Sequence, residues 1–435
     1  MKNCGSLSKA CGLLTMNDVA SRGRGQVFCR GCGSKRLFLA LDLGSSPIAN
    51  ALLTSPSVRP RTFPLELRVC EDCKLGQIGE FLTPENLFDD YPYFSSTSQS
   101  WLEKSSIFAE QVSMDLGLRK EDLILEIASN DGYQLRFFKE MGMQVLGVEP
   151  AKTVADVANA QGVPTRTVFF GKESALVLNR EGLKPKLIIA KNVLAHVPDL
   201  EDFVSGITLM CGRGTVVVIE APTILQISQG NQFDTIYHEH YSYLSATSVK
   251  NLFALHGLEL FGAERLGTHG GSVRLFARSK KSDVLQSPGQ ADTLNEILEE
   301  EARSNFGRPE SWLEVSERVS KTASDFKAWL TSKPDDSVTV GYGAAAKAVT
   351  LLSLTEPGTG SIDIIIDNSP GKIGKYLPVG NTPIVSETEF LSTIKPGPYR
   401  FVVFPWNLAG EILPRIRAID PQAEVVAAVP HLRSL

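Results

Sequence analysis

Residues 122–150, DLILEIASNDGYQLRFFKEMGMQVLGVEP, set the fold class of this chain. An apolar run, Asp122–Ala128, is followed by a helical pattern over Tyr133–Met141 and by a second apolar run, Gln144–Val148. A strand, a helix and a strand in this order predict a parallel sheet with helices on both faces. The alternation continues downstream, with a helix expected over 154–161 and strands over 164–170, 187–190 and 215–219. We therefore expect an α/β fold with a doubly wound sheet.

The loop after the first strand, Leu125–Gly132, is the first candidate ligand site. A ligand bound there meets the N–H groups of a helix N-terminus beyond the carboxyl end of a strand. The loop lacks the GxGxxG fingerprint of dinucleotide sites, but the second strand ends in Glu149, an acid that can accept both hydroxyls of a ribose. An ordinary α/β turn is the alternative interpretation. The residues that we expect around a nucleoside cofactor in this place are Glu126, Ala128, Asn130, Gly132, Glu149 and Asn192.

Two CxxC pairs near the N-terminus point to a metal ion. Cys29 and Cys32 form the first pair, Cys70 and Cys73 form the second, and 37 residues separate the pairs. Each knuckle places two thiolates on one side of a tight turn, so two knuckles supply the four sulfurs of a closed tetrahedral zinc site. Unrelated buried cysteines are the alternative, but two such pairs seldom arise by chance. We expect one structural zinc ion per chain, with no catalytic role.

A cluster of histidines, FDTIYHEHY at 233–241, is the second candidate site. It closely follows the strand expected over 215–219, and His196 lies at the end of another expected strand. Loops beyond the carboxyl ends of parallel strands are where such sheets carry out chemistry. A histidine with a pKa of about 6.5 is a ready general base, and a neighbouring carboxylate can orient it. Metal binding by the HxH pair and a hydrogen-bonded structural turn are the alternatives.

A second glycine-containing loop, Gly341–Lys347, also follows an expected strand and opens a helix. Small residues let the backbone approach a phosphate, and Lys347 adds a positive charge in the first helical turn. The next strand ends in Asp367, so the segment is similar to half of a dinucleotide site, although the third glycine is missing. Close packing of the helix on the strand explains the small residues equally well. The residues that we expect at a phosphate-bearing ligand are Gly341, Tyr342, Gly343, Lys347 and Asp367.

The pattern divides the 435 residues into five parts. We expect a loose tail over 1–24, a zinc-binding module over 25–85, the doubly wound domain over 86–280, connecting helices over 281–335 and a second, Rossmann-like α/β domain over 336–435. A net charge of −5 argues against binding to nucleic acid. Since no apolar run reaches the roughly 18 residues that a membrane helix needs, we expect a soluble, cytoplasmic protein without membrane contact, and a monomer.

Together these motifs resemble the sugar C-3′-methyltransferase family, which acts on nucleotide-linked 4-keto deoxysugars. The matching segments, in the order of the family, are CRGC, CEDC, YPYFSS, LEIASNDGY, GVEP, NVLAHVPDL, FDTIYHEHYSYLS, THGGS, GYGAAAKA, IDNSPGKIGKYLPVG and FPWN. They span residues 25–435, and FDTIYHEHYSYLS is the most specific of them. The resemblance implies an N-terminal zinc-binding module and a central class I methyltransferase sheet that binds S-adenosylmethionine. It also implies a C-terminal Rossmann-like domain that binds the nucleotide sugar, with dTDP as the expected nucleotide.

The resemblance also implies roles for individual residues. It makes His240 the base that removes the proton from C-3′, and we expect the neighbouring Glu239 to orient it. It places Tyr237, Glu239, His196 and Tyr91 around the sugar, and we expect His196 and Tyr91 to bind or polarise the enolate. Two other functions remain open from the residues alone: an O- or N-methyltransferase acting on another acceptor, and a non-catalytic module that binds zinc and nucleotide.

Overall fold

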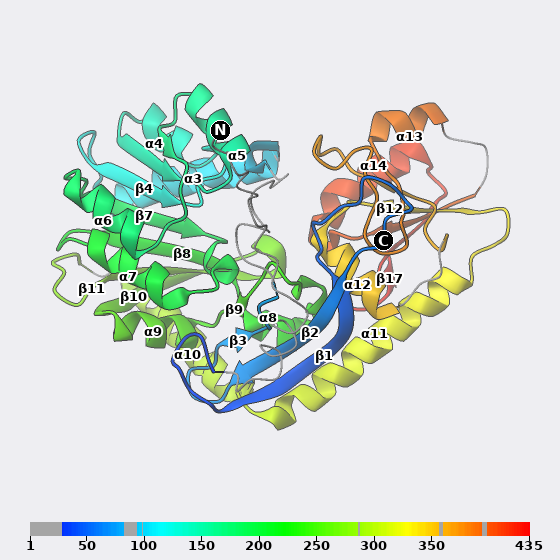
Figure 1. The fold of residues 1–435 in the computed structure, drawn as a ribbon, viewed down its shortest axis with the longest axis horizontal. Coiled ribbons are helices and arrows are strands. Elements are labelled where there is room, and N and C mark those ends of the chain that lie inside the picture. The colour runs from blue at the N-terminus through cyan, green and yellow to red at the C-terminus, as the bar shows by residue number, and fades with distance from the viewer. Residues whose placement is uncertain (1–27, 82–93, 98, 286–287, 356–359, 394–397) are drawn as a thin grey trace, which may run out of the picture.

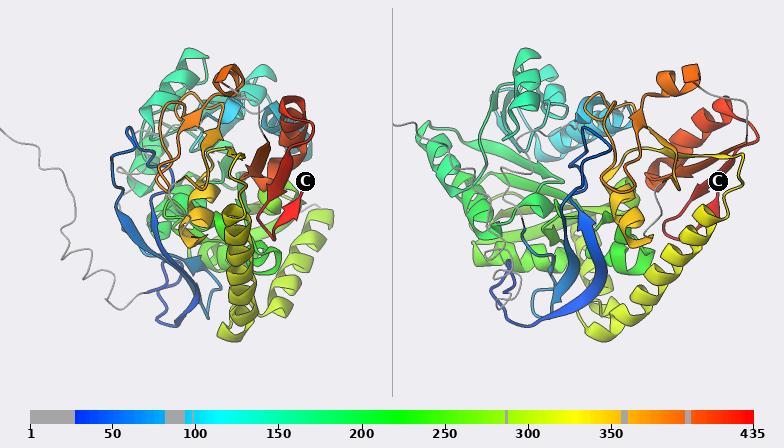
Figure 2. Two further views of the ribbon diagram at one scale, coloured as in Figure 1. Left: turned by 90° about the vertical axis from the view of Figure 1, so that its right-hand side faces the viewer. Right: turned by 45° about the vertical axis from the view of Figure 1, so that its right-hand side comes forward.

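Figure 1 shows the computed structural model, which describes residues 28–81, 94–97, 99–285, 288–355, 360–393 and 398–435. The tail expected over 1–24 and the candidate residue Tyr91 lie outside these ranges. The described residues form three sheets, and helices pack on both faces of the largest one (Figures 1 and 2). Among the described helices, none is both long and apolar enough to cross a membrane.

The central sheet has seven strands in the order β10-β11-β8-β7-β4-β5-β6. Neighbouring strands from β8 through β6 run parallel, whereas β11 and β10 are antiparallel at one edge. The doubly wound α/β fold is thus confirmed. The strand bounds are β4 (Leu123–Ile127), β5 (Gln144–Val148), β6 (Thr165–Arg166), β7 (Pro185–Lys191), β8 (Val216–Pro222), β10 (Leu258–Leu266) and β11 (Ser272–Ser279).

The strand expected over 164–170 is much shorter in the structure, where β6 holds two residues. Because β6 lies at the sheet edge and pairs with β5 alone, the chain leaves the sheet after Arg166. Val168 and Phe169 are consequently exposed rather than buried in the sheet.

The helices of this domain show the spacing of amphipathic helices. In α7 (Leu200–Met210) the buried residues include Phe203, Ile207 and Met210, and the Asp199 side chain caps the N-terminus by accepting the N–H of Asp202. The other helices are α3 (Gln99–Leu116), α4 (Leu135–Glu140), α5 (Lys152–Ala160), α6 (Lys172–Arg180), α8 (Ile224–Gly230) and α9 (Ala246–Leu255).

The N-terminal sheet has four strands in the order β1-β2-β3-β9, and all its pairings are antiparallel. Its strands are β1 (Leu37–Pro47), β2 (Thr62–Cys70), β3 (Gly76–Gln77) and β9 (Ser242–Tyr243). The last of these comes from the middle of the chain, directly after the histidine cluster. The sheet therefore joins the N-terminal module to the second candidate site.

The C-terminal domain contains a six-stranded sheet in the order β14-β13-β12-β15-β16-β17, parallel except at β17. Its strands are β12 (Val338–Tyr342), β13 (Ile364–Ile366), β14 (Ile384–Val385), β15 (Tyr399–Val403), β16 (Glu424–Ala427) and β17 (Arg433–Ser434). Its helices are α12 (Ala346–Thr355), α13 (Glu387–Thr393) and α14 (Ala409–Ile419). This is the second α/β domain expected from the sequence.

Two long helices, α10 (Pro288–Ser304) and α11 (Leu313–Thr331), connect the two α/β domains. Figure 1 shows α11 running under the C-terminal domain, with the strands β1 and β2 between that domain and the central sheet. One hydrophobic core crosses these boundaries. It includes Leu65 of β2, Phe233 of the histidine segment, Phe326 of α11 and Val349 of α12. The C-terminal domain therefore packs firmly on the rest of the chain.

Candidate active site and zinc site

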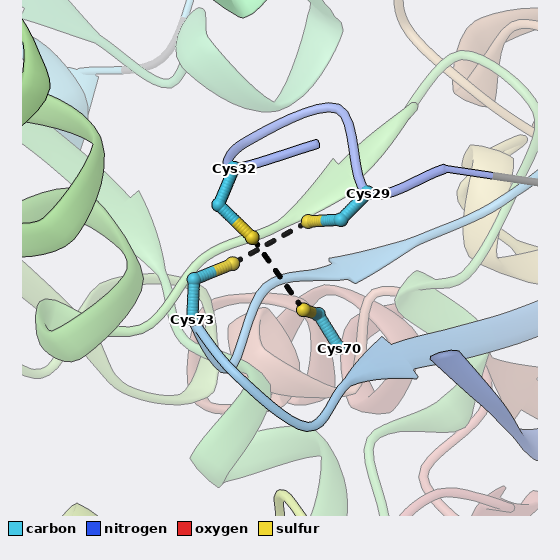
Figure 3. Close-up of side chains that lie close together, drawn as sticks. All are labelled: Cys29, Cys32, Cys70 and Cys73. Carbon is cyan, nitrogen blue, oxygen red and sulfur yellow. Dashed lines mark hydrogen bonds between the residues drawn. The ribbon is translucent and has the colours of Figure 1, made fainter. Parts of the chain in front are cut away.

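Four cysteine sulfurs meet between the two knuckles of the N-terminal module (Figure 3). The Sγ atoms of Cys29, Cys32, Cys70 and Cys73 all lie within 4.8 Å of one another. Cys29 Sγ is 3.4 Å from Cys73 Sγ, and Cys32 Sγ is 3.7 Å from Cys70 Sγ. Four sulfurs on one tetrahedral zinc ion lie about 3.8 Å apart, because a Zn–S bond is about 2.3 Å long. The spacing fits zinc, and the structure brings together the predicted ligand set.

The cysteine side chains of this cluster also shift one another's pKa values. Hydrogen bonding with Cys70 raises the pKa of Cys29 to about 12, and hydrogen bonds from Cys29 and Cys73 lower the pKa of Cys70 to about 2. A divalent ion among the sulfurs stabilises all four as thiolates. The first knuckle closes through the N–H of Gly33, which donates to the Cys29 carbonyl at 2.7 Å and has a φ of +71°.

The loop after β4 has the backbone shape of a ligand cradle. Ala128, Asn130 and Gly132 have φ values of 55°, 49° and 76°, in the left-handed region that alanine seldom adopts. Glu149, at the end of β5, holds this shape because its carboxylate accepts the N–H groups of Asn130 (3.0 Å) and Ala151 (2.9 Å). Burial raises the pKa of Glu149. Both carboxylate oxygens of Glu149 thus accept backbone N–H groups, so the hydroxyls of a bound ribose would share these oxygens with the backbone.

Several buried polar atoms around this loop have no hydrogen-bond partner among the described residues. They are Glu126 Oε2, Ser129 Oγ, Asp131 Oδ1 and Asn192 Oδ1. Buried polar atoms are nearly always paired in native proteins, so this cluster indicates a polar ligand. Burial raises the pKa of Glu126 well above its usual range, and the charge of Lys191 opposes that rise. The ammonium group and hydroxyls of S-adenosylmethionine are suitable partners, so these residues fit the cofactor.

His240 is held at both ring nitrogens within the segment 233–241, which we call the catalytic loop after the role that we propose for it below. Its Nδ1 lies 3.1 Å from the carbonyl oxygen of Thr235, and its Nε2 lies 2.9 Å from the hydroxyl of Tyr237. A carbonyl oxygen can only accept, so Nδ1 carries a proton. In the neutral ring Nε2 then accepts the Tyr237 hydroxyl. The ring is therefore oriented with its basic nitrogen toward Tyr237.

His196 lies beside His240, although the two residues come from different strand ends. Their ring centroids are 4.6 Å apart in an edge arrangement. His196 Nδ1 lies 2.7 Å from the backbone carbonyl of Glu239, which again places a proton on Nδ1. Burial lowers the pKa of His196 to about 4. His196 is therefore neutral at pH 7, and its Nε2 is an acceptor.

The Glu239 side chain does not face His240, contrary to the expectation that it orients the base. Its carboxylate Oε1 accepts the backbone N–H of Asn50 at 2.7 Å and the side-chain amide of Asn50 at 3.0 Å. Burial raises the pKa of Glu239. The Thr235 carbonyl, rather than the Glu239 carboxylate, lies at His240 Nδ1 and orients the ring.

The C-terminal domain reaches the catalytic loop through Trp406. The indole N–H of Trp406 donates to Asp234 Oδ2 at 2.7 Å, and burial raises the pKa of Asp234 to about 6. Lys347 Nζ lies 4.3 Å from the centroid of the Trp406 ring and donates to Asn407 Oδ1 at 2.9 Å. A Cβ on Gly270 would lie 2.4 Å from the Trp406 ring, so glycine permits this contact. Lys347 is thus placed between the two domains.

Packing accounts for the two glycines of the second loop. A Cβ on Gly341 would lie 2.8 Å from the Phe404 ring, and one on Gly343 would lie 2.6 Å from Pro405. Asp367 accepts the N–H groups of Ala344 and Ser369, both at 2.8 Å.

The remaining candidate of this loop, Tyr342, also has a partner within the domain. Its hydroxyl donates to Glu387 Oε2 at 2.6 Å, and burial raises its pKa to about 12. Of the five predicted residues, Lys347 is the one that the structure brings to the catalytic loop.

Sequence reasoning missed several residues of the site. Trp406 lies within the FPWN segment, and Asp234 and Thr235 lie within FDTIYHEHY, so their motifs had been noticed without a role. Nothing in the sequence singled out Asn50, because its link to Glu239 spans 189 residues.

Three family models match consecutive parts of the chain. They describe a zinc binding domain (residues 29–88), a methyltransferase domain (108–261) and a C-methyltransferase C-terminal domain (267–430). This chain belongs to the family of S-adenosylmethionine-dependent C-methyltransferases. Its cofactors are S-adenosylmethionine and a zinc ion on the four cysteines. The C-methyltransferase NovU of Streptomyces niveus is 31% identical over 389 residues, which are 88% of this chain and 91% of NovU.

Similar solved structures are more distant. Magnesium protoporphyrin IX methyltransferase of Synechocystis PCC 6803, with bound S-adenosylmethionine, is 16% identical and covers 46% of this chain and 98% of that one, with a TM-score of 0.33. The PH0226 protein of Pyrococcus horikoshii is 12% identical and covers 45% and 98%, with a TM-score of 0.34. Similarities at this level say nothing about the substrate of this chain.

Proposed function

We propose that this enzyme methylates C-3′ of a nucleotide-linked 4-keto deoxysugar, with dTDP as the nucleotide, through an enolate that His240 generates. The observation that carries the proposal is the hydrogen-bonded pair of Tyr237 and His240, in which Nε2 of the neutral ring accepts the hydroxyl. A carbon acceptor needs such a base, because its proton must leave before the carbon can attack. Oxygen and nitrogen acceptors already carry a lone pair.

The proton transfer follows from this geometry. In a 4-keto sugar the C3–H bond is α to a carbonyl and is therefore acidic. His240 Nε2 takes the proton, the electron pair of the C–H bond forms the C3–C4 double bond, and negative charge develops on the C4 oxygen. Nε2 has one lone pair, so the Tyr237 hydroxyl must turn from Nε2 to the C4 oxygen before the proton is taken, and it then donates to the oxygen on which charge develops. The Thr235 carbonyl continues to accept Nδ1–H and stabilises the imidazolium.

For His196 we propose a different part from the expected one of polarising the enolate. A neutral ring with its proton on Nδ1 cannot donate from Nε2, so His196 would accept a hydrogen bond from the substrate or Tyr237 rather than donate one to the enolate. We keep Tyr91 as a residue that faces the sugar, on the resemblance alone.

The cofactor site proposed here is the cradle after β4. Its residues are Glu126, Ala128, Asn130, Gly132, Glu149 and Asn192. Glu149 fixes the cradle and shares its carboxylate with the ribose, while Glu126 and Asn192 pair their unsatisfied oxygens with polar groups of the ligand. When bound, S-adenosylmethionine supplies an activated methyl group as the electrophile.

The diphosphate of the substrate is assigned to the loop Gly341–Lys347. Lys347 supports this, because it is a half-buried cation beside Trp406 and lies between the C-terminal domain and the catalytic loop. Asp367 holds the loop by accepting the Ala344 N–H, which leaves phosphate binding to the start of α12 and to Lys347.

The test combines product analysis with proton exchange. The enzyme is incubated with a dTDP-linked 4-keto deoxysugar and S-adenosylmethionine labelled with ¹³C in the methyl group, and NMR locates the label. We expect it on C-3′. A second incubation, in heavy water with S-adenosylhomocysteine, should exchange the C3 proton for deuterium. A label on oxygen or nitrogen would favour the other methyltransferase function, and no heat on titration with S-adenosylhomocysteine would favour a non-catalytic module.

A further inference from the structure

Tyr243, which lies outside the catalytic loop, forms hydrogen bonds with the backbone of the loop. The Tyr243 hydroxyl accepts the backbone N–H of Tyr237 at 3.1 Å, and it lies 3.4 Å from the carbonyl oxygen of the same residue, to which it donates. Both peptide groups of Tyr237 are thereby tied to one side chain, which is 5% exposed. Tyr237 in turn sets the position of the His240 ring through its own hydroxyl.

Tyr243 belongs to β9, and β9 is held by the zinc module. Gly76 pairs with Tyr243 across β3 and β9, and the N–H of Ile78 donates to the Tyr241 carbonyl at 3.1 Å. β3 begins just after the second knuckle, where the N–H of Cys70 donates to the Leu75 carbonyl at 2.9 Å. A continuous run of backbone hydrogen bonds thus leads from a zinc ligand to the strand that carries Tyr243.

The first knuckle also forms hydrogen bonds with β3 and the residue that follows it. The N–H of Arg30 donates to Gln77 Oε1 at 2.9 Å, and its guanidinium donates to the Ile78 carbonyl at 3.0 Å. Both knuckles therefore fix β3. The approach is close, because a Cβ on Gly76 would lie 3.0 Å from Tyr243 Cβ and 2.6 Å from Ile224 Cδ1.

We propose that Tyr243 is a positioning residue for the Tyr237–His240 pair, and that the zinc module holds Tyr243 in place through β3. The inference rests on the proposed role of His240 as base. It gives the zinc module a part in catalysis without contact between the metal and the substrate, because the two knuckles fix the strand against which the catalytic loop is placed.

Tyr243→Phe tests this with little change in shape. The substitution removes the hydroxyl and leaves the ring, so the backbone of Tyr237 loses both of its hydrogen bonds with residue 243. We expect kcat and the rate of C3 proton exchange to fall together by about five- to thirtyfold, which corresponds to one or two lost hydrogen bonds. KM for both substrates, affinity for S-adenosylhomocysteine and zinc content should stay at the wild-type level. Tyr399→Phe, which removes the hydroxyl of a buried tyrosine in β15 far along the chain, is the matched control and should keep normal turnover.

A second variant, Gly76→Ala, displaces β9 without removing any polar group. It should also slow proton exchange while zinc and cofactor binding persist. Normal turnover and exchange in Tyr243→Phe would overturn the inference, as would a loss of zinc or cofactor binding in parallel with turnover in both variants, which would show a purely structural role. Failure of the proposed function is seen separately, since His240→Asn would then exchange the C3 proton as fast as the wild type.

Discussion

Replacing His240 with asparagine is the most direct test of the proposed base. The substitution removes Nε2, the atom to which the Tyr237 hydroxyl donates at 2.9 Å. The amide of asparagine can still donate to the Thr235 carbonyl, so one of the two polar contacts of the ring survives. We therefore expect the loop to keep its course, while turnover falls by about 10²–10⁴-fold, the usual contribution of a general base.

The cost to stability should be small by comparison. The variant loses one hydrogen bond and the edge contact with the His196 ring at 4.6 Å. Together these lower the free energy of unfolding by about 1–2 kcal/mol, a fraction of the stability of a typical domain. Binding of S-adenosylhomocysteine should not change, because within the part of the chain that the structure describes the His240 ring bonds to Thr235 and Tyr237, whereas the cofactor cradle lies after β4 and β5.

The assay is steady-state methyl transfer, with cofactor titration and thermal unfolding on the same preparation. His256→Asn is the matched control, because His256 bonds to Ser205 at the end of α9, outside the catalytic loop. It should retain wild-type turnover. Near-normal methylation by His240→Asn would refute the role of His240 as base and make Tyr237 or His196 the leading candidate.

Other substitutions test the remaining assignments. Cys70→Ser should lower the zinc content, measured by elemental analysis, from one ion per chain and destabilise the N-terminal module, because metal binding and folding are coupled; an intact fold without zinc in the wild type would contradict this. Glu149→Ala should weaken cofactor binding, measured by calorimetry, by about 1.5–3 kcal/mol for each charge-assisted hydrogen bond lost; an unchanged dissociation constant would place the cofactor elsewhere. Burial lowers the pKa of His196 to about 4, whereas a histidine in the unfolded chain has a pKa of about 6.5. The unfolded state therefore binds the proton first as the pH falls, and the free energy of unfolding should decrease by about 3 kcal/mol between about pH 6.5 and pH 4. Urea titrations should show a weaker pH dependence in His196→Asn, after allowance for Asp234, whose pKa of about 6 acts in the opposite direction between pH 4 and 6.

The sequence was informative where local pattern determines structure. Alternating apolar and helical segments predicted the central sheet, since its inner strands β4, β7 and β8 are buried on both faces. The CxxC pairs predicted a zinc site that needed no knowledge of the intervening chain. The left-handed conformation of Ala128 and Asn130 was not predicted, because alanine in particular seldom adopts a positive φ.

Long-range contacts could not be predicted in this way. The Glu239–Asn50 and Asp234–Trp406 hydrogen bonds join residues that are 189 and 172 positions apart. Nothing local distinguishes a carboxylate that orients a neighbouring histidine from one that binds a distant amide. The orientation of Glu239 was therefore wrong from sequence, whereas the proximity of His196 to His240 followed from both lying at the carboxyl edge of one sheet.

The catalytic loop is where the three parts of the chain meet. The zinc module contributes Asn50, which binds Glu239, and the central sheet contributes His196, which binds the backbone of the same residue.

The C-terminal domain contributes Trp406, which binds Asp234, and Thr350, whose hydroxyl donates to the Ile236 carbonyl at 2.7 Å. A base on a loop is inherently less well placed than one on a helix or strand, and a displacement of about 1 Å can cost about 10²-fold in rate. Hydrogen bonds from neighbouring residues of this loop to three separate parts of the chain fix the position of the loop more precisely. One hydrophobic core joins residues of the zinc module, the catalytic loop and the C-terminal domain, and this rigid docking supports the placement of the proposed base, His240.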